Sequence, residues 1–218
     1  MVVAIDGPAG VGKSTISKQI AERTGFLYLN SGNFYRAVTY LALQEGIDSR
    51  DSESITALAE KLDFSIVNGA LHVNGKNIEE HLHTDAVDAR VAQVSAIVPL
   101  RRIINRAILK SSRGLDIIVE GRDMTTVVFP DADLKIFLDA SVETRAERRF
   151  KQGVSRLSLE EIKRGIEQRD EIDRNKEEGS LKISSDALYL DTSDLTIEQV
   201  CEKVIETLRI DKTSTQEK

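Results

Sequence analysis

The stretch "VVAIDGPAGVGKST", residues 2–15, decides the fold of this chain. It opens with an apolar run that is too short for a helix and is typical of a buried parallel strand ending at Asp6. The next residues, "GPAGVGKS" from Gly7 to Ser14, fit the phosphate-loop pattern G-x-x-x-x-G-K-[ST]. In this pattern backbone N–H groups surround a phosphate, Lys13 reaches the β and γ oxygens, and the Ser14 hydroxyl ligates Mg²⁺. The start of the chain therefore predicts a site for a phosphorylated nucleotide.

Composition limits the class of protein. The chain has 218 residues, 40% of them hydrophobic and 30% charged, as in an ordinary globular domain. Its net charge of −6 disfavours a general nucleic-acid binder, which needs a basic surface. The sequence contains neither a run of roughly 20 apolar residues, the length of a membrane helix, nor a signal-peptide pattern. We therefore expect a cytoplasmic protein with no nucleic-acid or membrane partner.

Two further expectations concern cross-links and assembly. Cys201 is the one cysteine, which excludes an intrachain disulfide and a thiolate metal cluster. We expect it to act as a small apolar residue on a helix. The sequence has no coiled-coil repeat and no obvious interface pattern, so we expect a monomer.

Short apolar runs alternate with helical patterns along the chain. After the first run, four more are expected to be strands, at residues 26–30, 116–123, 134–140 and 187–193. Helical patterns lie between and after them, at about 13–24, 31–45, 53–63, 84–112 (broken near Pro99), 141–153, 158–176 and 196–210. This alternation predicts an α/β fold with a five-stranded parallel sheet flanked by helices. Ligands of such sheets bind beyond the carboxyl ends of the strands.

One segment departs from this alternation. In "FSIVNGALHVNGKNI", residues 64–78, two Asn-Gly pairs separate strand-like segments. Asn-Gly is a strong hairpin signal because both residues tolerate positive φ. We therefore predict a small antiparallel insertion at about residues 62–80.

Arginines are concentrated where the ligand edge of the sheet is expected. Arg36 and Arg122 follow strand ends directly, and others lie on the long helix and on the charged helices after residue 140: Arg101, Arg102, Arg145, Arg148, Arg149, Arg156 and Arg169. The planar guanidinium makes paired hydrogen bonds to phosphate. An acidic protein with this arrangement is predicted to bind a second phosphorylated molecule, which favours phosphoryl transfer over hydrolysis. The glycine-flanked segment "RRFKQGVSR", residues 148–156, is expected to close as a lid, with mobile arginines at 145–156.

Other uses of the nucleotide remain open at this point. A GTPase switch would carry an Asn-Lys-x-Asp motif, which the sequence lacks. A hydrolytic ATPase would have a strand ending in an acidic residue that activates water, and Glu120 at the end of "DIIVE" is a candidate. However, Arg122 and Asp123 lie beside it, and the position of Arg122 favours binding of another anion.

Five segments together resemble the bacterial cytidylate kinase family of nucleoside monophosphate kinases. They are "IDGPAGVGKST", "LNSGNFYR", "VEGRDMTTVVFPDADLKIFLDAS", "RAERR" and "QRDEIDRNK", in the family's order from about residue 3 to 208. The resemblance implies a P-loop NTPase fold and the reaction of ATP with CMP or dCMP in the presence of Mg²⁺. A related small kinase that phosphorylates UMP, another monophosphate or a phosphate-free metabolite is the alternative enzyme, and a nucleotide-dependent switch or ATPase is the alternative of another class.

The resemblance also implies roles for individual residues. The ATP site comprises Gly7, Pro8, Ala9, Gly10, Val11, Gly12, Lys13, Ser14 and Thr15. The acceptor site comprises Ser31, Tyr35, Arg36, Arg101, Arg122, Asp123, Arg169 and Asp173, with Arg101 and Asp123 as readers of the cytosine base. The catalytic set comprises Lys13 and the lid residues Arg148, Arg149 and Arg156, and Ser14 is the metal ligand.

Four positions differ from the family's common residues. Ala92 stands where Ser is frequent, which removes a hydroxyl near the base, and Lys176 stands where Arg is frequent. Asn30 replaces a common Asp, and Thr125 replaces a common Gly. None of the four lies in the phosphate loop.

The expected organisation is one kinase domain over residues 1–210, followed by a disordered tail at 211–218. Residues 1–32, 113–144 and 184–210 form the expected core. Residues 33–112 form the monophosphate-binding region, and residues 145–183 form the lid and the helix after it.

Overall fold

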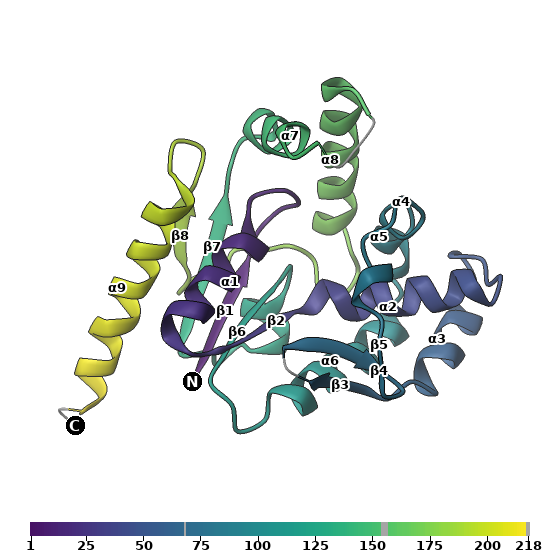
Figure 1. Ribbon diagram of the computed structural model, residues 1–218, viewed down its shortest axis with the longest axis horizontal. Coiled ribbons are helices and arrows are strands. Elements are labelled where there is room, and N and C mark those ends of the chain that lie inside the picture. The colour runs from purple at the N-terminus through teal and green to yellow at the C-terminus, as the bar shows by residue number, and fades with distance from the viewer. Residues whose placement is uncertain (68, 154–156, 217–218) are drawn as a thin grey trace.

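The computed structural model describes residues 1–67, 69–153 and 157–216 (Figure 1). Its central sheet comprises β1 (Val2–Asp6), β2 (Leu27–Asn30), β6 (Ile117–Gly121), β7 (Leu134–Asp139) and β8 (Leu188–Asp191). The strand order is β2-β6-β1-β7-β8, and every neighbouring pair is parallel. The predicted five-stranded parallel sheet is therefore confirmed.

Strand β1 lies in the middle of this sheet because its residues are apolar on both faces. Val3, Ala4 and Ile5 are fully buried. Val3 and Ile5 belong to one hydrophobic cluster and Ala4 to the other, because successive side chains of a strand point to opposite faces. The chain leaves β1 toward β2 on one side of it and later returns to β7 on the other side. The phosphate loop after β1 therefore emerges at the point where ligands of open parallel sheets bind.

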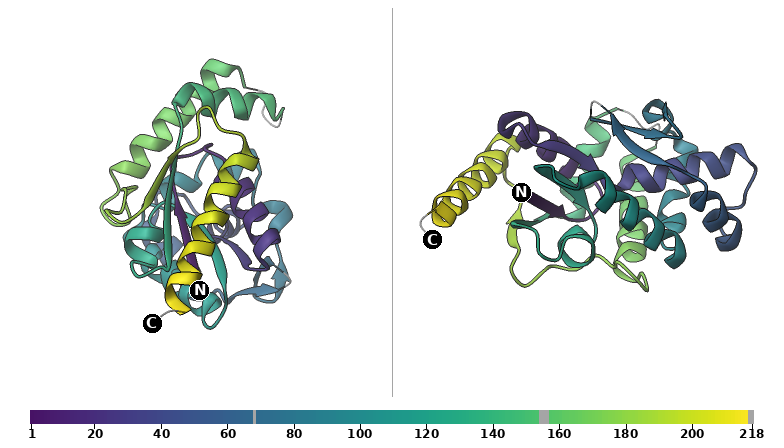
Figure 2. Two further views of the ribbon diagram at one scale, coloured as in Figure 1. Left: turned by 90° about the vertical axis from the view of Figure 1, so that its left-hand side faces the viewer. Right: turned by 90° about the horizontal axis from the view of Figure 1, so that it is seen from below.

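Helices cover both faces of the sheet. On one face, α1 (Lys13–Thr24) and α9 (Ile197–Gln216) contribute Ile16, Ile20 and Val204 to one cluster. On the other face, α2 (Ser31–Gln44) and α6 (Val98–Ser112) contribute Phe34 and Ile104 to the second cluster. Figure 2 shows α9 at one end of the molecule and α2 toward the other end. Cys201 is fully buried in the α1–α9 cluster, which confirms its expected role as a small apolar residue.

Two helix predictions need correction. The stretch 84–112 forms three helices, α4 (Asp85–Asp88), α5 (Val91–Val94) and α6, and the last break precedes Pro99. Pro99 lies in the first turn of α6, where its missing N–H costs no hydrogen bond. Helix α9 continues to Gln216, whereas a disordered tail was expected from residue 211. Residues 211–216 contain no Gly or Pro that would end a helix.

The predicted antiparallel insertion is a three-stranded sheet of β3 (Phe64–Val67), β4 (Ala70–Val73) and β5 (Lys76–Asn77). Asn74 and Gly75 both have positive φ, 50° and 75°, as the hairpin signal requires. Asn68 of the other predicted turn lies outside the described residues. The insertion packs on the main core through Phe64, whose ring centroid is 5.4 Å from that of Phe34. Helix α3 (Ser52–Glu60) and a 3₁₀ turn, η1 (Glu79–His81), flank it in the chain.

Helices α7 (Val142–Lys151) and α8 (Leu159–Arg174) project together beyond the carboxyl end of the sheet, at the top of Figure 1. They share a small apolar cluster of Ala146, Ile162 and Ile166. A capping box between Ser158 and Glu161 begins α8. Among the described residues, we find no helix with the length and apolar character needed to cross a membrane.

Candidate active site

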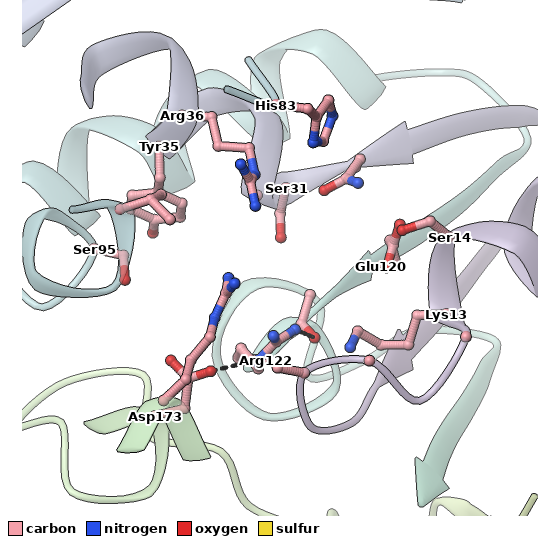
Figure 3. A pocket seen from close by; sticks show the side chains of 18 of the residues that line it. Lys13, Ser14, Ser31, Tyr35, Arg36, His83, Ser95, Glu120, Arg122 and Asp173 are labelled. Carbon is pink, nitrogen blue, oxygen red and sulfur yellow. Dashed lines mark hydrogen bonds and ion pairs between the residues drawn. The ribbon is translucent and has the colours of Figure 1, made fainter. Parts of the chain in front are cut away.

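A cavity of about 370 Å³ lies at the carboxyl end of the central sheet, within the usual size of small-molecule sites (Figure 3). Its walls come from the loop after β1, helix α2, the segment after β6, and helices α6, α7 and α8. It brings together most of the predicted site residues: Ala9, Gly10, Gly12, Lys13, Ser14, Thr15, Ser31, Tyr35, Arg36, Arg101, Arg122, Asp123, Arg148, Arg149, Arg169 and Asp173.

The phosphate loop has the backbone that its glycines predict. Gly10 and Gly12 adopt φ of 79° and 100°, which side chains rarely tolerate. Gly12 is the residue before α1, and the first turn of α1 contains no acidic side chain. The positive end of the helix dipole and its free N–H groups therefore face the cavity without a competing carboxylate.

Lys13 holds the loop in place from inside. Its Nζ donates to the carbonyl oxygens of Gly7 and Pro8, each at 2.8 Å, and the residue is 5% exposed. Burial, followed by the field of Arg122, lowers the pKa of Lys13 well below its ordinary value. The ammonium group is therefore short of negative partners, and a bound phosphate would supply them.

Oxygen atoms gather beside Lys13, where the Mg²⁺ of a nucleotide would lie. The Tyr28 hydroxyl donates to Oε1 of Glu120 at 2.5 Å and also interacts with Ser14. Asn30 donates to the same Tyr28 hydroxyl at 3.2 Å. Hydroxyl and carboxylate oxygens are the ligands that Mg²⁺ takes, alongside phosphate oxygens and water. In the described part of the chain, no group of three or more His, Cys, Asp and Glu side chains is arranged to hold a metal ion by itself.

A second set of cations faces the phosphate loop across the cavity. Arg36 of α2 donates to Oδ1 of Asp88 at 2.6 Å, and Arg122 after β6 donates through Nε to Oδ2 of Asp173 at 2.7 Å. The Nε of Arg169 is buried and has no hydrogen-bond partner among the described residues. Burial, and then the charge of Arg122, lower the pKa of Arg169 to about 10. Buried donors normally have acceptors, so the Arg169 Nε is available to an acceptor such as a phosphate oxygen.

The far end of the cavity presents a donor and an acceptor side by side. Nη2 of Arg101 and Oδ2 of Asp123 are 2.5 Å apart, and both side chains are 3% exposed. The Arg101 guanidinium lies over the Tyr35 ring, 5.4 Å from its centroid, and also donates to the carbonyl of Ser95. The Tyr35 hydroxyl is buried without a hydrogen-bond partner in the described structure. These groups match the edge of a planar, polar ring better than a phosphate.

Asp173 links the two halves of the acceptor side. Its carboxylate accepts from Arg122 and, at 2.7 Å, from Lys176. Burial opposes its ionisation, but Arg122 and Lys176 hold the pKa of Asp173 well below the usual range. Asp173 therefore remains an anion that orients Arg122.

The arginines on α7 have different environments. Arg148 donates to the carbonyl of Thr192 at 2.5 Å, and Arg149 lies 3.6 Å from Asp88 across the cavity. The expectation of a mobile Arg145 is wrong. It is 2% exposed, donates to the carbonyl of Ala9 and pairs with Asp170 at 2.7 Å, so it fixes α8 to the phosphate loop. Arg156 lies outside the described residues.

The sequence profile of the family described as Cytidylate kinase matches residues 3–210. The chain belongs to the cytidylate kinase family. It is 40% identical over 217 residues to "Cytidylate kinase" of Borrelia turicatae, covering 97% of this chain and 98% of that protein. It is 39% identical to "Cytidylate kinase 1" of Borreliella burgdorferi, covering 97% and 98%. Among solved structures, a gluconokinase from Sinorhizobium meliloti covers 99% of this chain and 96% of its own, with a TM-score of 0.51 and 12% identity, which bears on the fold alone.

The four positions that the sequence resemblance marked as departures lie in different surroundings. Ala92 is not a lining residue, and its carbonyl accepts from the Ser95 hydroxyl at 2.9 Å. Lys176 lines the cavity and pairs with Asp173. Asn30 lines it beside Tyr28, whereas Thr125 is buried behind it.

Some cavity residues were not predicted from the sequence, and some predicted ones do not line the cavity. Ser95, His83, Val91 and Gln152 are additional lining residues. Ser95 is the one with a usable signal, because it lies at the break in the helical pattern just before Arg101. Three predicted loop residues are not lining residues: Gly7, Pro8 and Val11. The first two accept from Lys13, and Val11 is buried in the core.

Proposed function

We propose that this chain transfers the γ-phosphoryl group of ATP to CMP or dCMP, giving ADP and CDP or dCDP in a reversible reaction. The observation that carries the proposal is a single cavity in which the phosphate loop faces a second cationic set. The buried, unpartnered Nε of Arg169 belongs to that second set. A hydrolase needs cations for one nucleotide, whereas a phosphotransferase with a phosphorylated acceptor needs cations for two phosphorylated molecules. Membership of the cytidylate kinase family supports the choice of acceptor.

The donor nucleotide is proposed to bind at residues 7–15. Its β and γ oxygens replace the carbonyls of Gly7 and Pro8 as partners of the Lys13 ammonium group. Mg²⁺, held through Ser14 with Glu120 behind it, would neutralise charge on the transferred group. The oxygen cluster around the Tyr28 hydroxyl supports this assignment.

The acceptor phosphate is proposed to bind between Arg36, Arg122 and Arg169. An acceptor phosphate is already an anionic nucleophile, so the reaction needs no strong general base. One of its oxygens attacks the γ-phosphorus, and the bond from that phosphorus to the oxygen of ADP breaks. The protein's contribution is then alignment and neutralisation of charge, the main sources of catalysis in phosphoryl transfer.

The base is proposed to bind beside Tyr35, Arg101 and Asp123. A carboxylate accepts from the cytosine amino group, and an adjacent guanidinium donates to the acceptor atoms of the same ring. Uracil has a carbonyl where cytosine has its amino group, so Asp123 would face it without a hydrogen-bond donor. The charge pair at 2.5 Å therefore favours cytosine over uracil.

The end of α7, from Arg148 onward, is proposed to close over the bound substrates and exclude water, which would compete as acceptor. The contact of Arg149 on α7 with Asp88 on α4 connects the lid to the acceptor side. A phosphate between Arg36 and Arg149 would compete with the Asp88 carboxylate for both guanidinium groups.

The test is a coupled assay of purified protein with ATP and Mg²⁺ over a panel of acceptors. We expect rapid ADP formation with CMP and dCMP, slower formation with UMP, and very little ADP without an acceptor. Direct detection of CDP identifies the product. Failure to form CDP from CMP would refute the proposal, and ADP formation that does not depend on an acceptor would favour an ATPase.

A further inference from the structure

Asp6, the last residue of β1, lies between the two substrate sites. It is fully buried and directly precedes the phosphate loop. Its carboxylate contacts the two residues that follow Asp123. Oδ1 accepts from the backbone N–H of Met124 at 3.0 Å, and Oδ2 accepts from the backbone N–H of Thr125 at 2.7 Å.

A third hydrogen bond comes from the side chain of Thr125. The Thr125 hydroxyl donates to Oδ2 of Asp6 at 2.7 Å, and Thr125 is 1% exposed. Two backbone donors and one hydroxyl donor therefore surround one carboxylate inside the protein. Charge-assisted bonds of this kind are stronger than neutral ones.

The segment held by Asp6 carries the proposed acceptor readers. Met124 begins a short π-helical turn, η2 (Met124–Val128), immediately after Arg122 and Asp123. Turns of this type are frequent at functional sites. The preceding Gly121 allows a close fit, since a Cβ there would lie 2.5 Å from the Ser31 hydroxyl oxygen. A small shift of this segment would therefore displace Arg122 and Asp123 together.

We infer that Asp6 and Thr125 form a positioning pair. The pair holds Arg122 and Asp123 in position for the acceptor nucleotide and connects them to the start of the phosphate loop. The pair touches neither substrate and acts through the backbone of residues 124 and 125. This inference rests on the proposed function for the identity of the acceptor, but the hydrogen bonds themselves do not.

The charge state of Asp6 gives the pair a measurable signature. Burial raises the pKa of Asp6 to about 6, and the Thr125 hydroxyl and N–H oppose that rise. Asp123 also raises it and is itself paired with Arg101 from α6. The other charged groups nearby, Lys13 of α1 and Glu120 of β6, line the cavity. Loss of the Thr125 hydroxyl would therefore move the titration of Asp6 toward neutral pH, where a protonated carboxyl no longer accepts all three hydrogen bonds.

The test compares Thr125→Val, which keeps the shape and removes the hydroxyl, with Thr125→Ser, which restores the hydroxyl. Initial rates with CMP and with ATP are measured from pH 5.5 to 9, and equilibrium affinities for both nucleotides are measured by calorimetry. We expect Thr125→Val to raise the KM and Kd for CMP about tenfold at pH 7, the value of one hydrogen bond. The Kd for ATP should stay within about twofold. As the pH is lowered, Thr125→Val should lose CMP affinity at a higher pH than the unmodified protein. Thr125→Ser should lose it at the same pH as the unmodified protein.

Two outcomes would overturn the inference. One is a Thr125→Val variant with the CMP affinity and pH profile of the unmodified protein. The other is equal weakening of CMP and ATP with no shift of the pH profile, which indicates a merely structural role. If Thr125→Val does not fold, carboxyl ¹³C NMR of the unmodified protein, with Asp6→Asn for assignment, decides the question. Asp6 must then titrate together with the amide signals of residues 124 and 125, and independent titration refutes the pair.

The design separates this inference from the proposed function. If the unmodified protein forms no CDP, the proposed function fails, while the NMR titration still tests the Asp6–Thr125 pair. If CDP forms and the variants match the unmodified protein, only the pair fails.

Discussion

Arg101 and Asp123 form a buried ion pair, with Nη2 of Arg101 2.5 Å from Oδ2 of Asp123 and 3% of each side chain exposed. A buried pair of this kind is weak as a source of stability, because desolvation offsets the attraction. Its position at the end of the cavity instead suits recognition. The pair offers a carboxylate acceptor and a guanidinium donor, and the guanidinium lies over the Tyr35 ring.

The first prediction concerns base selection. Asp123→Asn replaces an acceptor-only carboxylate by an amide that also donates, so it loses the preference for an amino group on the base. We expect the ratio of kcat/KM for CMP to that for UMP to fall about 10- to 100-fold, the usual value of such a contact. Asp186→Asn is the matched control, because Asp186 is exposed, pairs with Lys135 and does not line the cavity. An unchanged ratio in Asp123→Asn would mean that the base is read elsewhere.

The second prediction concerns Arg169, whose buried Nε has no hydrogen-bond partner in the described structure. Arg169→Ala removes a buried donor that has no acceptor in the described structure. Burial and Arg122 already disfavour its charge, as its lowered pKa of about 10 indicates. We therefore expect the melting temperature without ligand to stay the same or rise, while the KM for CMP rises about 10- to 100-fold. Thermal unfolding with and without CMP provides the measurement, and a marked loss of stability without ligand would argue for a structural role of Arg169.

The sequence predicts the parts of this protein whose structure is determined locally. The five strands are short apolar runs, and Asn74 and Gly75 predict a hairpin because both residues tolerate positive φ. The phosphate loop is equally local, because its glycines and Lys13 are consecutive. The Arg36 and Arg122 positions follow from the rule that ligands lie at the carboxyl ends of parallel strands.

What the sequence does not predict depends on contacts between distant segments. Arg145 and Arg148 carry the same charge on the same helix. Of these two, Arg145 is the one that pairs with Asp170, which lies 25 residues further along the chain on another helix, and the paired Arg145 side chain is buried. Asp6 looks like an ordinary strand end until Thr125, 119 residues later, is brought against it. Ser95 joins the cavity because the chain breaks between α5 and α6. No local pattern identifies such partners in a single sequence.

The third prediction tests the phosphate loop. Lys13→Ala removes the cation proposed to contact the β and γ oxygens, so we expect kcat to fall at least about 100- to 1,000-fold. The fold should persist, because Lys13 contacts only carbonyls of its own loop among the described hydrogen bonds. Circular dichroism and steady-state rates are the measurements, with Lys163→Ala, which breaks a partly exposed pair with Glu143, as the control. Retained turnover in Lys13→Ala would contradict the assignment of the loop.

The fourth prediction concerns the buried pair that connects α8 to the phosphate loop. Asp170→Ala leaves the Arg145 charge buried without its partner, which we expect to cost about 3–5 kcal/mol of the free energy of unfolding. Asp170 also accepts from the backbone N–H of Ala9, at 3.4 Å, so the KM for ATP should rise as well. Glu143→Ala, at a partly exposed pair, should cost far less of the free energy of unfolding, because solvent screens that pair. Urea unfolding measures the free energy of unfolding of both variants. Equal losses would show that the buried pair contributes no more to stability than the exposed one.

The fifth prediction follows from the titration of Asp6. Burial raises its pKa to about 6 in the folded protein, compared with about 3.9 in an unfolded chain. Below about pH 4 both states hold the proton, so the group contributes no pH dependence. Between about pH 4 and 6 the folded state holds more protons than the unfolded state, and the free energy of unfolding therefore falls as pH rises. Above about pH 6 the free energy of unfolding has fallen by its full amount, about 3 kcal/mol.

Asp6→Asn isolates this effect because asparagine does not titrate. Groups with depressed pKa values, such as Asp173, contribute the opposite slope, but they are present in both proteins and cancel in the comparison. Urea unfolding at intervals from pH 4 to 8 should show the unmodified protein losing stability relative to Asp6→Asn as the pH rises to about 6, and a constant difference above it. A difference that does not depend on pH would mean that Asp6 titrates alike in the folded and unfolded chains. The hydrogen bonds from Met124 and Thr125 would then offset the whole cost of burying the carboxylate.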